Sequence, residues 1–117
     1  MTEPPSVAEL ISVVDAELQR TERQIESLAL TVAAIVEAAE LVSTDDEHDP
    51  EGSTIAYERA QATALLRQAR ADREALLGTR RQLAGGGPIE CATCAGPIDP
   101  DRIAALPTAA RCVTCAR

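Results

Sequence analysis

The sequence predicts a mainly α-helical protein in which a long antiparallel coiled-coil hairpin precedes a small cysteine-rich module. Two heptad series of apolar residues, separated by a short acidic stretch, indicate the hairpin. Two C-x-x-C pairs within residues 91–115 indicate the module. We place an N-terminal segment and the hairpin at residues 1–87, and the module at residues 88–117.

The first helix is expected over residues 6–42. Pro4 and Pro5 precede it, and Ser6 with Glu9 forms a capping-box sequence at its start. Thr21 is the single interruption in a seam with alternating spacings of three and four, formed by Ile11, Val14, Leu18, Ile25, Leu28, Val32, Ile35, Ala39 and Val42. A helix of this length would extend roughly 55 Å.

The second helix is expected over residues 54–83, with Ser53 or Thr54 as its cap. Its seam is poorer in large side chains, and alanine allows close helix approach while burying little area. We expect Tyr57 to pack against the first helix. The seam repeats every seven residues at Ile55, Ala62, Ala69, Leu76 and Leu83, and is broadened by Leu65, Leu66 and Leu77.

The stretch STDDEHDPEGST, residues 43–54, joins the two helices. Pro50 and Gly52 are expected to break any continuous helix, which makes this stretch the tip of the hairpin. Its acidic residues are either solvated charges of a loop or the residues through which the protein acts. His48 is expected to be a solvated residue. The candidate tip residues are Asp45, Asp46, Glu47, Asp49 and Glu51.

The net charge of −8 is divided unevenly along the chain. Residues 1–58 carry a net charge of −12, whereas residues 59–117 carry +4. The acidic part would be repelled by nucleic acid phosphates and attracted to a basic protein surface. The arginines of the second helix are expected to balance acids of the first, or else to contact a partner; they are Arg67, Arg70, Arg73, Arg80 and Arg81.

The sequence shows neither a signal-peptide pattern nor an apolar run of membrane-spanning length, which predicts a cytoplasmic protein without membrane contact. Its cysteines should then be reduced and available for metal.

The four cysteines predict one structural zinc ion. Cys91 and Cys94 form one pair, Cys112 and Cys115 form the other, and seventeen residues separate the pairs. Four thiolates complete a tetrahedral shell and leave no position for water, so the zinc would not be catalytic. A redox C-x-x-C is the rival interpretation, but it needs a βαβ context that is absent. Sequence-specific DNA binding is disfavoured, because few arginines and no aromatic residues lie nearby.

With these motifs, the chain resembles the DksA/TraR family of bacterial proteins with a C4-type zinc finger. The matching residues are Cys91, Cys94, Ile98, Arg102, Ile103, Ala105, Pro107, Thr108, Ala109, Cys112 and Cys115. The resemblance implies a transcription regulator, not an enzyme, that binds RNA polymerase rather than DNA. The hairpin would enter the secondary channel of the polymerase, its acidic tip would approach the active site, and the finger would dock outside.

The sequence departs from the family pattern in three places. The family tip usually reads Asp-x-x-Asp-x-Ala; here Asp46 and Asp49 supply the aspartates, but Glu51 replaces the alanine. Ala95 stands where the family has glycine after the second cysteine. Leu106 and Ala116 stand where members that respond to ppGpp carry basic residues, so we expect a weak ppGpp response or none.

Two alternatives remain open. The tip carboxylates of Asp45, Asp46 and Glu47 are hard oxygen ligands suited to Mg²⁺, as in transcript-cleavage factors of the Gre type, in a cleavage or anti-cleavage role. Alternatively, the hairpin pairs with another coiled coil, and the finger only closes its end, which would make the protein an adaptor.

Overall fold

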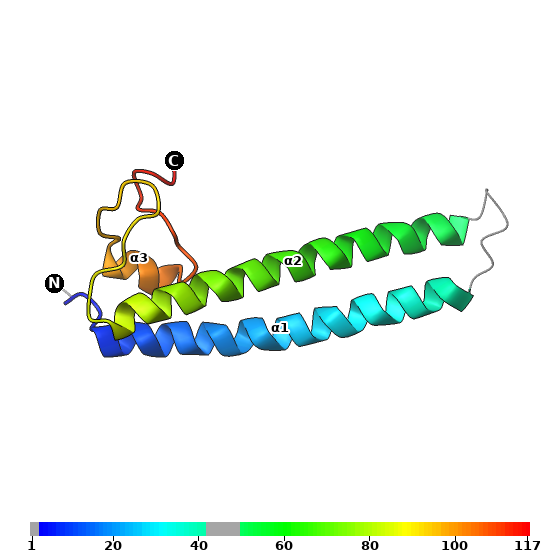
Figure 1. Cartoon of the computed structure of the whole chain (residues 1–117), viewed down its shortest axis with the longest axis horizontal. Coiled ribbons are helices and arrows are strands. Elements are labelled where there is room, and N and C mark those ends of the chain that lie inside the picture. The colour runs from blue at the N-terminus through cyan, green and yellow to red at the C-terminus, as the bar shows by residue number, and fades with distance from the viewer. Residues whose placement is uncertain (1–2, 42–49) are drawn as a thin grey trace. The chain divides into compact units, whose positions relative to one another are not determined.

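The fold consists of two long antiparallel helices that pack as a hairpin, followed by the four-cysteine module (Figure 1). The computed structural model describes residues 3–41 and 50–117, with side chains from residue 53 onward in the second range. The helices are α1 (Val7–Leu41), α2 (Pro50–Ala84) and α3 (Pro100–Ala105). Over these ranges there is no strand, only an isolated bridge between Glu90 and Pro97. The predicted fold class is confirmed.

α1 begins as the sequence predicts. The Ser6 side-chain oxygen accepts a hydrogen bond from the Glu9 backbone N–H at 3.1 Å, which satisfies one of the donors left unpaired at a helix start. Val14 and Leu18 are buried along the predicted seam, and Leu10, beside the seam, is also buried. Thr21, the residue that interrupts the apolar series, is also buried at its seam position.

α2 begins earlier than the sequence predicts, and this is a correction. Pro50 and Gly52 were expected to break the helix, yet α2 starts at Pro50. Proline is tolerated in the first helical turn because its missing N–H would be unpaired there in any case. Ser53 and Thr54 therefore lie inside α2 and do not cap it.

The chain divides into two compact units, which we call the terminal unit (Met1–Thr21 and Ala71–Arg117) and the middle unit (Glu22–Arg70). The terminal unit contains the start of α1, the end of α2 and the whole cysteine module. The middle unit contains the remaining parts of both long helices. The predicted domain boundary between residues 87 and 88 stays a prediction.

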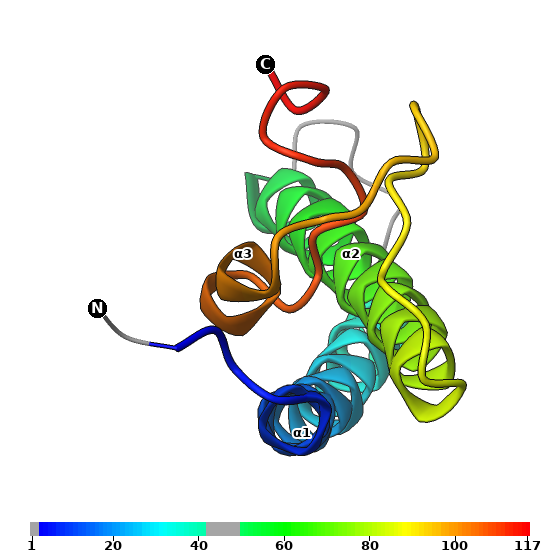
Figure 2. The same cartoon turned by 90° about the vertical axis from the view of Figure 1, so that its left-hand side faces the viewer.

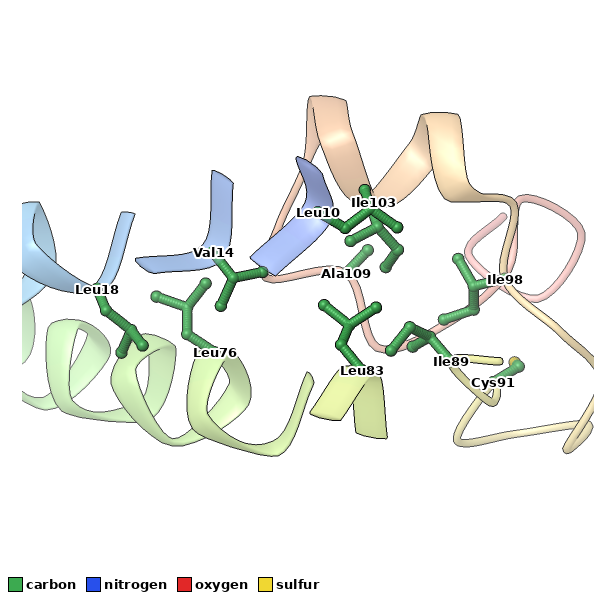
Figure 3. Packing of buried hydrophobic residues seen from close by; sticks show 10 residues of the cluster. All are labelled: Leu10, Val14, Leu18, Leu76, Leu83, Ile89, Cys91, Ile98, Ile103 and Ala109. Carbon is green, nitrogen blue, oxygen red and sulfur yellow. The ribbon is translucent and has the colours of Figure 1, made fainter. Parts of the chain in front are cut away.

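The terminal unit has one continuous apolar core, to which both helices and the module contribute. Within this unit, α3 lies against the start of α1 (Figure 2). The cluster comprises Leu10, Val14, Leu18, Leu76, Leu83, Ile89, Cys91, Ile98, Ile103 and Ala109 (Figure 3). Val14, Leu76 and Ile103 are fully buried. The module has too few apolar side chains for a core of its own, and it completes one with the helices.

The middle unit confirms the predicted seam but not all of its neighbours. Ala62, Leu66 and Ala69 are buried, and the α1 seam residues from Ile25 to Ala39 are half-buried. The prediction that Tyr57 packs against α1 is wrong, because its side chain is 70% exposed. Tyr57 lies two residues after the seam residue Ile55, which turns it about 200° around the helix and away from α1.

The ion pairs of α2 only partly follow the prediction. Arg80 Nε donates to Asp15 Oδ1 at 2.6 Å, which joins the two long helices within the terminal unit. This hydrogen bond and the negative charge of Asp15 raise the pKa of Arg80. Arg73 instead approaches Glu74 of its own helix at 3.8 Å.

Candidate metal centre

The first cysteine pair lies on a tight turn that follows α2 after residues 85–90. The Ile98 N–H donates to the Ile89 carbonyl at 2.7 Å, and the Cys91 N–H donates to the Gly96 carbonyl at 2.7 Å. These two bonds fold the chain back on itself, so that Cys91 and Cys94 lie on the same turn. Ala95 adopts a left-handed conformation with φ of 62°.

Ala95 has this left-handed conformation at the position where the sequence comparison with the DksA/TraR pattern expects glycine. The left-handed region favours glycine, and a residue with a Cβ costs about 1 kcal/mol there. The turn still closes, because the Ala95 N–H donates to the Cys91 carbonyl at 2.9 Å. Alanine at this position is therefore compatible with the cysteine turn.

The second cysteine pair follows α3 and is tied to the first turn by backbone hydrogen bonds. Asp99 caps α3 by accepting a hydrogen bond from the Asp101 N–H at 2.9 Å. After α3, the Ala92 N–H donates to the Ala110 carbonyl at 2.8 Å, which joins the two cysteine segments. Arg102 Nε donates to the Arg111 carbonyl at 2.9 Å and holds α3 to the chain before Cys112.

These connections bring all four cysteine sulfurs together. The four Sγ atoms lie within 4.8 Å of one another, and Cys94 Sγ lies 3.9 Å from Cys112 Sγ. A tetrahedral zinc ion with Zn–S bonds of about 2.3 Å needs sulfur separations of about 3.8 Å. The cluster therefore needs only a small contraction to hold one metal ion, and four soft thiolates suit zinc.

The sulfurs differ in exposure and in electrostatic environment. Cys91 is buried, Cys112 and Cys115 are half-buried, and Cys94 is exposed. The pKa of Cys91 is lowered to about 6, mainly by the backbone N–H of Cys94 and next by the backbone N–H of Cys112. The Cys112 nitrogen lies 3.3 Å from the Cys91 sulfur. Hydrogen bonds with the side chains of Cys112 and Cys94 raise the pKa of Cys115 to about 12. One thiol of the cluster thus ionises easily and another resists ionisation.

These two pKa values predict that zinc affinity rises with pH. The Cys115 thiol must lose its proton to bind zinc at any pH below about 12, which adds about tenfold in apparent affinity per pH unit. Cys91 adds a further dependence only below about pH 6, because above that value it is already a thiolate. Competition against a chelator at pH values between about 5 and 8 measures this dependence. An affinity that does not change with pH would contradict it.

The candidate tip residues are not described by the structure in the way that the cysteines are. Asp45, Asp46, Glu47 and Asp49 lie outside the described residues. Glu51 belongs to the first turn of α2, but its side chain is not among those described. Within the described ranges, the four cysteines form the single cluster of potential metal ligands. The role of the acidic stretch stays a prediction.

Sequence reasoning missed one contact that holds the module to the hairpin. The Gln82 side-chain oxygen, near the end of α2, accepts a hydrogen bond from the Glu90 N–H at 2.9 Å. This contact places the chain directly before Cys91. Because a solvent-facing glutamine in a helix is common, the sequence carries no signal for it.

Comparisons with known proteins add no assignment: no family model, no curated protein and no solved structure matches this chain. In the described part of the chain, none of the helices combines the length and the apolar character needed to cross a lipid bilayer.

Proposed function

We propose that this protein is a non-enzymatic regulator of bacterial RNA polymerase, of the type to which its sequence bears a resemblance, the DksA/TraR proteins. The observation that carries the proposal is the order of parts along the chain. A hairpin of two long helices is followed by a four-cysteine cluster whose segment fits the pattern of that family. The acids of residues 45–51 lie in the chain between those two helices.

The charge distribution supports a protein partner over a nucleic acid partner. Residues 1–58 carry a net charge of −12, which would oppose phosphate backbones and would favour a basic channel. Electrostatic complementarity of this kind increases the rate of association and orients the incoming chain. The acidic stretch would enter such a channel first, and Asp46, Asp49 and Glu51 are the residues that would act there.

The cysteine module would have a structural role in this function. Four thiolates leave no coordination position for a substrate or water, so zinc would hold the fold of the module and supply no chemistry. A response to ppGpp is not part of the proposal. Leu106 is 47% exposed and Ala116 is exposed, and neither offers a positive charge to an anionic nucleotide.

Neutralising the tip tests the proposal. The triple variant Asp46→Ala, Asp49→Ala and Glu51→Ala is expected to lose regulation in transcription assays run with and without ppGpp. Its zinc content and helicity should be those of the wild type. The matched control is Glu22→Ala, Glu37→Ala and Glu40→Ala, which removes three exposed acids of α1 and the same amount of charge. We expect the control to keep regulation at saturating protein concentration, because removing charge from α1 would slow association but would leave the tip unchanged.

Three outcomes would contradict the proposal. The wild type could fail to bind core polymerase, the tip variant could regulate as well as the wild type, or both triple variants could lose activity equally. Release of short 3′ RNA fragments from stalled complexes in Mg²⁺ would instead identify the cleavage-factor alternative.

A further inference from the structure

The two long helices have a common heptad register that defines two opposite faces of the hairpin. In α1, Ile25 and Val32 occupy position a of the heptad. In α2, Leu66 occupies position a, and Ala62 and Ala69 occupy position d. Because the helices run in opposite directions, the order of heptad positions runs clockwise around one helix and anticlockwise around the other when both are viewed along the same axis. Positions c and g of both helices therefore lie on one face, and positions b and e lie on the other.

In the middle unit, the face formed by positions c and g is exposed and almost without charge. We call it the c/g face: residues 24, 27, 31, 34, 38 and 41 of α1 with residues 54, 58, 61, 65 and 68 of α2. Every one of these side chains is exposed, and Glu58 is the single charged residue among them. The others are glutamine, serine, threonine, alanine and leucine. Leu41 is 84% exposed and Leu65 is 49% exposed.

The charges of the middle unit lie elsewhere. Positions b and e hold Glu22, Glu26, Glu40, Arg67 and Arg70, whereas Arg23 and Glu37 lie at position f of α1 and Arg59 lies at position a of α2. With Glu58 as its single charged residue, the c/g face is a surface that a partner can cover with little desolvation of ions, the most costly kind of desolvation.

Some of the same heptad positions are in contact with the protein's own module in the terminal unit. Leu10 at position g of α1 is buried in the core that includes Ile103 (Figure 3). Thr79 at position g of α2 is also buried, and Gln82 at position c binds the Glu90 N–H. Individual c and g positions of the terminal unit, such as Leu10 and Gln82, thus take part in contacts with the module. In the middle unit, positions c and g are exposed to solvent.

The surface relief of α1 favours a helical occupant. A shallow hollow borders the c/g face and is lined by Arg23, Glu26, Ser27, Leu30, Thr31 and Ala34. Ser27 and Ala34 are small, so a neighbouring helix can approach closely at these positions. Leu30, at the border of the hollow, is 66% exposed.

We propose that the c/g face is where a second copy of this chain packs, so that two hairpins form a four-helix bundle in the middle unit. In a two-fold dimer each surface meets itself, so a charged face would repel its partner. The c/g face avoids this cost in a chain whose net charge is −8. The amides of Gln24 and Gln61 can both donate and accept hydrogen bonds, so the face can pair with a copy of itself. Nucleic acid is disfavoured, because the face offers no cation.

The size of the face predicts a weak dimer. About eighteen residues of α1 and about fifteen of α2 span roughly 22–27 Å, and two helices with axes 8–10 Å apart present roughly 500 Å² per copy. The total of roughly 1,000 Å² is at the lower limit for specific interfaces. We therefore expect a dissociation constant on the order of 10–100 µM rather than nanomolar. The dimer would cover part of the hairpin and would disfavour insertion of the hairpin into any narrow partner site.

Two neighbouring alanines provide a matched test in the zinc-loaded full-length protein. Ala34→Glu places a charge on the c/g face, whereas Ala33→Glu places the same charge at position b of the opposite face. Both alanines are exposed in α1, so both variants should keep wild-type helicity. Sedimentation equilibrium from about 5 to about 500 µM should show a monomer–dimer equilibrium for the wild type. Ala34→Glu should weaken it at least tenfold, and Ala33→Glu should leave it unchanged.

A wild type that stays monomeric up to the highest concentration would overturn the proposal. So would equal weakening by the two variants, which would indicate bulk charge repulsion. Assembly beyond the dimer would also contradict it, because a two-fold pairing of one face closes on itself. The test does not use RNA polymerase, so its failure is separate from failure of the proposed function.

Discussion

Replacing Cys94 with serine is expected to prevent stable zinc binding and to unfold the cysteine module. Cys94 is the exposed cysteine of the four, so Cys94→Ser removes almost no packing. Any large effect must therefore come from the lost metal ligand. Structural zinc in small modules contributes apparent binding free energies of about 10–16 kcal/mol, whereas an ordinary surface substitution changes stability by about 0.5 kcal/mol or less.

The neighbouring substitution Thr93→Ser is the control, because Thr93 is exposed on the same turn and carries no thiol. We expect one zinc per chain in the wild type and in the control, and less than one in Cys94→Ser. Hydrogen exchange should show loss of protection in residues 88–117 and at the adjoining end of α2, since the module and the helices have a common core. Unchanged protection in a zinc-free variant would show that the module folds without metal.

Replacing Ile103 with alanine is expected to destabilise the terminal unit by about 2–5 kcal/mol, the usual range for a fully buried isoleucine. Ile103 has no exposed surface and lies in the core between α3 and the two long helices. Truncation would leave a cavity at the point where the module meets the hairpin. In a chain with no phenylalanine or tryptophan, this is a substantial fraction of total stability.

Leu106→Ala provides the comparison, because Leu106 lies directly after α3 and is 47% exposed. Urea denaturation of the zinc-loaded proteins should shift the midpoint strongly for Ile103→Ala and only slightly for Leu106→Ala. Equal shifts would mean that Ile103 does not join the module to the helices. A large loss of zinc in Ile103→Ala would show that the core also supports the cysteine cluster.

Much of the fold is predictable from the sequence because its signals are local and periodic. The heptad residues Ala62, Ala69, Leu76 and Leu83 are all buried as the pattern requires. The cap at Ser6 is also present. The predicted start of α2 is wrong because Pro50 and Gly52 would break a helix in its interior but are acceptable in its first turn. The prediction for Tyr57 is wrong because it rests on the apolar character of the side chain, whereas the position of Tyr57 away from the seam leaves that side chain exposed.

For the candidate metal centre, the sequence supplied the ligands and the tertiary structure supplied their convergence. The C-x-x-C spacing alone selects Cys91, Cys94, Cys112 and Cys115. That their sulfurs lie within 4.8 Å of one another depends on hydrogen bonds between segments about twenty residues apart. Such long-range contacts leave no periodic trace, so they cannot be deduced from composition or spacing.

By itself, the sequence determined that two helices pair through a heptad seam, that acids occupy the joint between them, and that four cysteines form two pairs. Only the tertiary structure decided that the module completes the core at Leu10 and Leu83, and which hairpin face stays exposed in the middle unit. The physical reason is that a seam repeats along one helix and is written in its own residues. The covering of a face depends on which distant segment, here Ile89 to Ala109, packs against it.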